Sequence, residues 1–234
     1  MSAPETILNR ADMVLSRTPR ELCDWVDAKA VELSRTKEGK AYARSGVLLP
    51  KKLWEEIRPL GLFALCRYGD AGIRCTPNLT NDNYDGKIEF SDPAASPVYI
   101  EMTYAKDGQD ERLRLKVLTK EGNVNALGNI KVSGTKASGR TIKVENEAVD
   151  HTDVRRVALD LVKERLNGKS NKQYGKDHIL VVIVDDYLLF RTDEDKEVLM
   201  RYTQAALLEL NLNVGAVYLL GSSGAYCARV SGEI

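Results

Sequence analysis

Apolar side chains recur at helical spacing through the first part of the chain. From Glu5 to about Ala43 the apolar positions follow a period close to that of an α-helix. Thr18 followed by Pro19 has the form of an N-cap and a first-turn proline, so a helix is expected to begin there. The apolar face of that helix consists of Leu22, Trp25, Val26 and Leu33. Residues 1–46 are therefore predicted to form a helical N-terminal section.

The pattern changes from helical to alternating after residue 69. A second helix is predicted over Pro50–Tyr68, with Pro59 and Gly61 expected to bend it. Runs rich in β-branched and aromatic residues then predict three short strands separated by polar turns. These strands are Ile73 to Cys75, Tyr84 to Phe90 and Val98 to Ala105.

The second half of the chain alternates helices and strands. The continuous apolar run His178 to Val184 is typical of a strand that is covered on both faces. A helix and a further strand follow it, which is the pattern of a right-handed crossover. Residues 47–234 are therefore predicted to be an α/β core with a mixed central sheet flanked by helices. Its other predicted elements are a helix over 107–121, a hairpin within Ile130 to Val144, a helix from Asp150 to Asn167, a helix from Glu194 to Leu212, and strands at Val214 to Leu220 and Ala225 to Val230.

The amino-acid composition makes several classes of function less probable. The 34 basic residues balance 34 acidic ones, so no global positive field indicates nucleic-acid binding, although local patches remain open. Four cysteines without a C-x-x-C pair and two histidines make a zinc site of the usual spacing improbable. No apolar run reaches the roughly 20 residues that a membrane span needs, and the N-terminus lacks the apolar core of a signal peptide. We therefore expect a cytoplasmic location and no membrane partner.

Two carboxylates stand on neighbouring predicted strands. Asp85 lies at the start of one strand and Glu101 lies inside the next, with a turn between them. Strands joined in this way are usually adjacent, so both side chains are expected to reach a shared divalent cation. Carboxylate oxygens suit Mg²⁺, which can lower the pKa of a bound water and offset charge on a phosphoryl group. Asp85 and Glu101 are therefore the predicted metal ligands.

The order of these acidic residues resembles the PD-(D/E)XK nuclease superfamily over roughly residues 50 to 220. The matching positions are Glu56, or alternatively Glu55, on the helix, Asp85 at the strand, and Glu101 in Glu101-Met102-Thr103. The resemblance implies a restriction-endonuclease-like fold, Mg²⁺-dependent cleavage of DNA phosphodiesters, and a role for Glu56 as an auxiliary acid. An association with restriction, repair or defence against mobile DNA follows from the superfamily alone.

Thr103 departs from the superfamily pattern, which places a lysine at that position. Because side chains alternate along a strand, Thr103 shares a face with Glu101 but supplies no positive charge. Lys136, Lys169 and Lys172 are the candidates for a replacement, and Lys172 is included in the predicted catalytic set with Glu56, Asp85 and Glu101.

Basic residues follow the centre of the chain. Lys136 and Arg140 lie in the predicted hairpin loop, and Lys169 and Lys172 follow the long helix, where flexible or helix-end cations suit phosphate contacts. These four are the predicted nucleic-acid-binding residues. The G-x-x-x-x-G-K-[ST] pattern of a P-loop is absent.

Two hypotheses of function result. The first is a Mg²⁺-dependent nuclease-like protein that acts on DNA. The second is a non-catalytic interaction or regulatory protein on a degenerate nuclease-like scaffold, in which the N-terminal helices serve self-association or partner binding. The missing strand lysine favours the second hypothesis, whereas the acidic Glu101 in an apolar strand favours the first.

Overall fold

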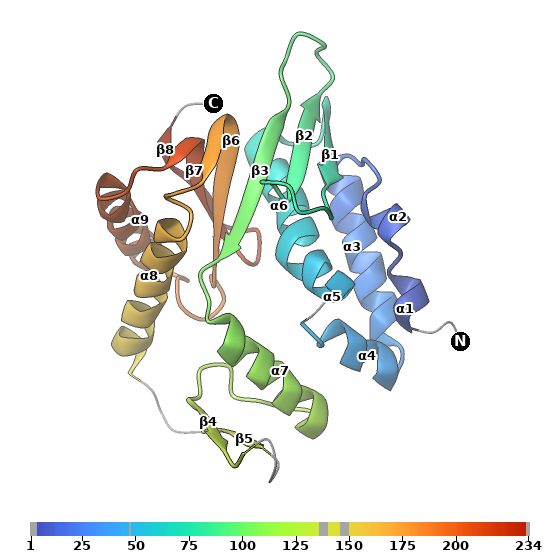
Figure 1. The fold of residues 1–234 in the computed structure, drawn as a ribbon, viewed down its shortest axis with the longest axis vertical. Helices are drawn as coiled ribbons and strands as arrows, with labels where there is room; N and C mark the ends of the chain where they lie inside the picture. Colours follow the sequence, from blue (N-terminus) through green and yellow to red (C-terminus); the bar gives the residue numbers. More distant parts are fainter. Residues whose placement is uncertain (1–3, 47, 136–139, 146–149, 233–234) are drawn as a thin grey trace.

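A mixed six-stranded sheet runs through the centre of the molecule (Figure 1). The computed structural model describes residues 4–46, 48–135, 140–145 and 150–232. Its first three strands pair antiparallel, the next two join in parallel, and the last strand pairs antiparallel, which confirms the α/β class and the mixed sheet. In spatial order the strands are β1 (Ile73–Pro77), β2 (Gly86–Phe90), β3 (Val98–Tyr104), β6 (Gln173–Val184), β7 (Asn213–Gly221) and β8 (Cys227–Gly232).

Helices lie on both sides of this sheet (Figure 1). Helices α8 (His151–Asn167) and α9 (Asp193–Leu208) lie on one side. The N-terminal helices and the helix that follows them lie on the other side. They are α1 (Pro4–Ile7), α2 (Arg10–Met13), α3 (Pro19–Ser34), α4 (Lys37–Ala43), α5 (Leu48–Lys52), the π-helical segment η1 (Leu53–Ile57) and α6 (Arg58–Tyr68). Among the helices of the described ranges, none has the length and apolar character that crossing a membrane requires.

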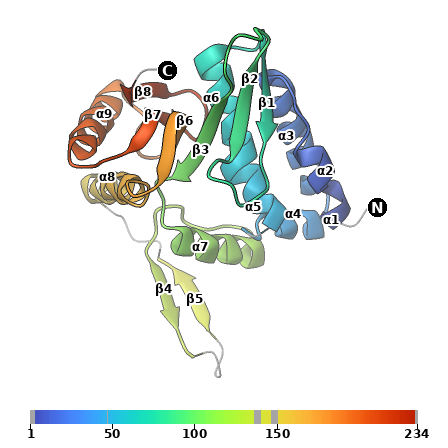
Figure 2. The same ribbon diagram turned by 45° about the horizontal axis from the view of Figure 1, so that its top comes forward.

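An additional unit is inserted between β3 and α8. It consists of α7 (Gly108–Glu121) and a two-stranded hairpin formed by β4 (Ile130–Ser133) and β5 (Thr141–Val144). Figure 2 shows the hairpin extending from α7 away from the central sheet. The predicted hairpin is confirmed, but Lys136 in its loop lies outside the described residues.

Alternation along the strands creates two buried clusters. Ile100 and Met102 of β3 belong to the cluster on the α3 and α6 side, whereas Leu180 and Val182 of β6 belong to the cluster under α8 and α9. Leu22 of the N-terminal section lies in the first cluster together with these sheet residues. The helical section therefore shares a core with the sheet, and a domain division near residue 47 stays a prediction.

Helix ends follow the capping residues that the sequence contains. Thr18 accepts from the Glu21 backbone N–H and the Glu21 carboxylate accepts from the Thr18 N–H, which completes a capping box. Asp107 and Asp150 cap α7 and α8 in the same general way. Gly122 ends α7 in the left-handed conformation, with φ of 81°. These boundaries are confirmed.

Other predicted boundaries are wrong in detail. The last long helix ends at Leu208 rather than Leu212, because the Glu209 N–H donates to the Ala206 carbonyl and the Leu210 N–H to the Leu207 carbonyl, which tightens the final turn. The strand predicted from Tyr84 begins at Gly86, because Asp85 uses its side chain to accept the next N–H of β3. The helix through Tyr68 changes its hydrogen-bond pattern at Leu53–Ile57, before the proline and glycine that were expected to bend it.

The outer edge of β1 is partly covered by the N-terminal section. Arg17 and Cys75 form an isolated antiparallel bridge, with N–H to carbonyl distances of 3.0 Å and 2.7 Å in the two directions. The Arg17 guanidinium also pairs with Asp12 at 2.5 Å and lies over the Trp25 ring. These contacts hold residue 17 against the edge strand.

Candidate active site

A cleft of about 840 Å³ opens along the second half of β3. Its walls come from η1, β3, α7 and the end of α8. Glu56, Asp85, Glu101 and Lys169 all line it. The structure therefore places three of the predicted acidic residues and one of the candidate lysines around a single cleft.

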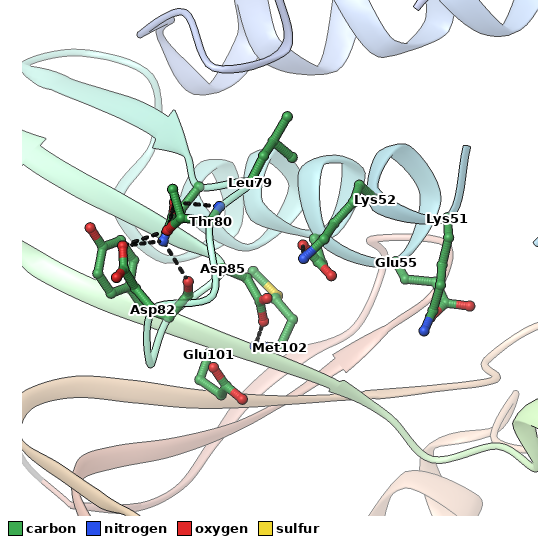
Figure 3. A network of polar contacts seen from close by, with 12 residues as sticks. Lys51, Lys52, Glu55, Leu79, Thr80, Asp82, Asp85, Glu101 and Met102 are labelled. Carbon is green, nitrogen blue, oxygen red and sulfur yellow. Dashed lines mark hydrogen bonds and ion pairs between the residues drawn. The ribbon is translucent and has the colours of Figure 1, made fainter. Parts of the chain in front are cut away.

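Asp85 lies where β2 stops pairing with β3. The register pairs Gly86 with Ile100, and the Asp85 N–H donates to the Ile100 carbonyl at 2.8 Å. Its Oδ2 accepts from the Met102 N–H at 2.8 Å, which replaces a missing backbone partner (Figure 3). One oxygen of the Asp85 carboxylate is thus hydrogen-bonded to the backbone of the residue that follows Glu101.

The loop before Asp85 is itself tied together. The Asn78 N–H donates to the Asp85 carbonyl at 2.8 Å, and the Asn78 amide donates to Asp82 Oδ2 and to the Tyr84 carbonyl, each at 3.1 Å. Thr80 Oγ1 lies 2.5 Å from the same Asp82 oxygen. Figure 3 shows this network beside Asp85, so the carboxylate projects from a loop that several hydrogen bonds hold in place.

Glu101 is a buried carboxylate, with 7% of its surface exposed. The Lys169 ammonium donates to its Oε1 at 2.5 Å, and the Tyr174 hydroxyl donates to the same oxygen at 3.2 Å. Lys172 lies farther away, with its Nζ 3.9 Å from that oxygen. Burying a charge without partners is costly, so Lys169 and Tyr174 account for the stability of Glu101 in this position.

Lys169 reaches the site from the turn after α8. Its N–H bonds to the Leu166 carbonyl, so the helix end positions the side chain. The prediction from sequence named both Lys169 and Lys172, and the structure brings Lys169 closer to Glu101. Lys172 instead lies 5.8 Å from the centre of the Tyr174 ring.

Glu56 enters the cleft from η1. Its Oε2 lies 2.6 Å from Lys52 Nζ, one helical turn earlier, and its side chain is 14% exposed. Burial, and then the charge of Asp85, raise the pKa of Glu56 to about 7. The alternative residue, Glu55, pairs with Lys51 at 3.8 Å and with Lys106 at 3.3 Å. Glu56 is the helical glutamate whose charge interacts with Asp85.

Burial, followed by the charge of Glu101, also raises the pKa of Asp85. The Met102 N–H and the charges of Lys52 and Lys169 act in the opposite direction. Asp85 therefore lies between two other acidic side chains, Glu56 and Glu101, and its charge repels both of them. A cation would relieve this repulsion.

Comparison of the chain with family models, curated proteins and solved structures finds no match. The role of each residue therefore depends on the geometry of this cleft.

The carboxylates of Asp85 and Glu101 suit a hard cation that takes only a few of its ligands from the protein. Asp85 and Glu101 each use one oxygen in the hydrogen bonds given above, and the second oxygens, Oδ1 and Oε2, take part in none of them. Across the described ranges, no three His, Cys, Asp or Glu side chains form a group that could hold a metal ion. Mg²⁺ commonly binds through one or two carboxylates, with water and substrate oxygens as its other ligands. The pair fits that kind of site and not an all-protein cage.

Tyr174 and Lys52 are contacts that the sequence did not predict for this site. Burial, followed by the charge of Glu101, raises the pKa of Tyr174. Tyr174 lies in the first half of a strand that was expected to begin at His178, so its approach to Glu101 depends on the longer β6. The contact of Lys52 with Glu56 could have been predicted from their spacing, because residues four apart on a helix lie on the same face.

The predicted nucleic-acid-binding residues divide between two places. Lys169 and Lys172 lie near Glu101, whereas Arg140 is exposed beside β5. Their contact with nucleic acid stays a prediction.

Proposed function

We propose that the chain is a Mg²⁺-dependent nuclease-like enzyme that cleaves DNA phosphodiesters, on a restriction-endonuclease-like scaffold. The observation that carries this proposal is the contact between Lys169 and the buried Glu101 beside Asp85. Two carboxylates and an ammonium group in one open cleft are suited to a phosphate group and its cation. A setting in restriction, repair or defence is an association of the superfamily that the sequence resembles.

Lys169 supplies the positive charge that Thr103 lacks. Thr103 lines the same cleft, but its hydroxyl is neutral. Lys169 approaches the carboxylate of Glu101 from the end of α8 and not from β3. An ammonium held there stabilises negative charge that develops on a phosphoryl oxygen.

Asp85 and Glu101 would hold Mg²⁺ through their carboxylate oxygens. When bound, the cation lowers the pKa of a coordinated water and offsets charge on the phosphate. The Met102 N–H fixes the orientation of Asp85, and Tyr174 fixes that of Glu101. The pKa of Glu56, about 7, lets this carboxyl group take up or release a proton near neutral pH, as an auxiliary acid requires.

The charge of the cleft links metal binding to DNA binding. Its lining contains five acidic and five basic residues, so their formal charges balance. A divalent cation makes it positive, which favours a polyanion. The acidic residues are Glu55, Glu56, Asp85, Glu101 and Glu111, and the basic ones are Lys51, Lys106, Arg112, Arg165 and Lys169.

Arg112 is the basic residue of the cleft best placed to contact a phosphate. Lys51 and Lys106 pair with Glu55, and Arg165 pairs with Glu164 at 3.4 Å. Arg112 is exposed on α7, lines the same cleft as the carboxylates, and has no acidic partner among the residues that the structure describes. We assign it to the DNA backbone on this basis.

A specific observation also favours the non-catalytic alternative. Lys169 and Tyr174 satisfy one oxygen of Glu101 without any metal, as they would in a purely structural ion pair. In that alternative the scaffold serves binding or regulation, with the N-terminal helices as a contact surface for a partner or a second copy.

Cleavage of supercoiled plasmid DNA distinguishes the two functions. The full chain is incubated with plasmid in Mg²⁺ and in EDTA, beside Glu101→Gln and the control Glu197→Gln. Glu197 is 75% exposed on α9 and pairs with Arg201, so its change alters charge but not the cleft. We expect Mg²⁺-dependent nicking that falls by about 100-fold or more in Glu101→Gln, since one transition-state interaction is commonly worth that much.

Thermal melts establish that each variant is folded. Wild-type chain that leaves plasmid and single-stranded DNA intact across divalent cations would support the non-catalytic alternative. Equal cleavage by folded Glu101→Gln would overturn the assignment of this cleft.

A further inference from the structure

The four cysteines are far apart in the sequence but lie near one another in two pairs. Cys23 and Cys75 interact electrostatically within the first buried cluster, and Cys66 and Cys227 share a side-chain hydrogen bond. All four are free thiols. The second pair joins the last turn of α6 to the first residue of β8.

Neighbouring contacts hold α6 against this edge of the sheet. The rings of Phe63 on α6 and Tyr218 on β7 meet edge to face, with centroids 5.1 Å apart. The Arg67 Nε donates to the Tyr218 hydroxyl at 2.8 Å. On the strand side, Cys227 pairs with Leu220 of β7. The two thiols therefore meet between elements that are already fixed relative to each other.

The two pairs differ in access to solvent. Cys66 is exposed and Cys227 is partly buried, so one thiol of this pair can meet a small oxidant. Cys75 is fully buried, and burial raises the pKa of its thiol to about 12, which keeps it protonated and unreactive. Burial also raises the pKa of Cys23. Only the Cys66–Cys227 pair combines proximity with an exposed member.

We propose that Cys66 and Cys227 form a reversible intramolecular disulfide when the protein meets a hydroperoxide. The thiolate form of Cys66 attacks the peroxide O–O bond, giving the Cys66 sulfenic acid and, from hydrogen peroxide, hydroxide. The Cys227 sulfur then attacks the sulfenic sulfur; the S–S bond forms, the S–O bond breaks, and the oxygen leaves as water. Two thiols and one hydrogen peroxide thus give one disulfide and two water molecules, and a dithiol reductant reverses the change.

The bond would join the helix to the edge strand across most of the chain. A cross-link that closes a long loop restricts the unfolded chain strongly, so the oxidised protein is expected to resist unfolding better than the reduced one. Burial, followed by the hydrogen bond with Cys66, raises the pKa of the Cys227 thiol. This inference is independent of the proposed nuclease activity.

Peptide mapping of the native full-length chain tests the proposal. The reduced protein is treated with a small excess of hydrogen peroxide, free thiols are blocked, and the digest is analysed by mass spectrometry with and without reductant. We expect a linked peptide pair containing Cys66 and Cys227, a loss of two hydrogen atoms from the intact mass, and a higher melting temperature that dithiothreitol reverses.

Variants identify the order of the steps. In Cys227→Ser the reaction should stop at a Cys66 sulfenic acid that dimedone traps, and the melting temperature should not respond to peroxide. The matched control Cys23→Ser should still form the linked peptide. Linkage of Cys66 only to a second copy of the chain, or no linkage while Cys66 is oxidised to sulfinic acid, overturns the proposal. The mapping of the wild-type protein decides this even where a variant fails to fold.

Discussion

Glu101 shows how one buried charge organises its surroundings. Its oxygen is shared by an ammonium from the turn after α8 and a phenol from β6, two elements that are remote from it in sequence. Removing either donor leaves part of the carboxylate unsatisfied in a site with little solvent. The residue is therefore sensitive to its partners in stability as well as in chemistry.

The substitution Lys169→Met tests whether Lys169 has an effect on cleavage and stability that other lysines near α8 do not have. We expect DNA cleavage to fall by about 100-fold, because the positive charge beside Glu101 is lost. The free energy of unfolding should also fall by about 1–3 kcal/mol, since Glu101 loses its ion pair. Plasmid cleavage and urea unfolding measure the two effects. Lys163→Met is the control, because Lys163 is partly exposed and pairs with Glu209 outside the cleft. Equal behaviour of the two variants would contradict the role of Lys169.

Glu56 should make stability depend on pH in an identifiable direction. Its pKa rises from an ordinary value of 4.5 to about 7 on folding, so the folded state binds the proton more tightly than the unfolded state. The free energy of unfolding should therefore fall as pH rises through this window, by on the order of 1–3 kcal/mol. Glu56→Gln should remove this decline and be the more stable protein at pH 8.

Urea unfolding of both proteins at pH 5, 6, 7 and 8 measures the slope. Glu89→Gln provides a control carboxylate, because Glu89 lies near the surface, 46% exposed, beside Lys87. A pH slope that is unchanged in Glu56→Gln would show that another group titrates in this range.

At the scale of elements, the start of β2 depends on a close approach between backbone and helix. A Cβ at Gly86 would lie 2.4 Å from Leu60 Cδ2, and Leu60 is fully buried on α6. Gly86 therefore lets β2 lie against the helix directly after Asp85. The same contact helps to set where Asp85 meets β3.

Gly86→Ala should destabilise the protein by about 1–3 kcal/mol, because Leu60 must move within a packed core. It should also weaken cleavage through the displacement of Asp85. Gly108→Ala is a matched control, since a Cβ at Gly108 meets nothing within 4 Å and lies in the first turn of α7. That control should be neutral or stabilising by up to about 1 kcal/mol. Urea unfolding of both variants gives the comparison, and equal stabilities would contradict the packing argument.

Local signals predicted the elements better than they predicted the site. Caps such as Asp107 act within a few residues of the chain, so the ends of α7 could be read from the sequence. The choice between Lys169 and Lys172 could not be read in this way, because it depends on where the turn after α8 lies relative to β3. The π-helical segment that carries Glu56 was also missed, since its apolar spacing resembles that of an ordinary helix.

At the scale of the whole molecule, the absence of net charge makes DNA affinity dependent on the cation. We expect Ca²⁺, used as a non-cleaving substitute, to raise the affinity for a short duplex about tenfold or more over that in EDTA, because the cleft becomes positive. Fluorescence anisotropy at several salt concentrations measures this. Equal affinity with and without Ca²⁺ would show that DNA binding does not depend on a cation held by the carboxylates of the cleft.

Arg112→Ala should weaken that binding and lower the slope of log affinity against log salt by about one phosphate contact. Lys116→Ala is the control, because Lys116 is also exposed on α7 but is not part of the cleft lining. The same salt titration compares them. A slope that falls equally in both variants would indicate general surface charge and not a defined contact.

The bridge between Arg17 and Cys75 has a consequence for how copies of the chain can meet. It occupies part of the outer edge of β1, while β8 at the opposite edge has no further strand partner in the part of the chain that the structure describes. An exposed edge strand can pair with a strand of another copy, and contacts that occupy its backbone groups oppose this pairing. Where this bridge lies, β1 has no free backbone groups to offer a second copy, so we expect any strand addition by another copy to favour the edge at β8.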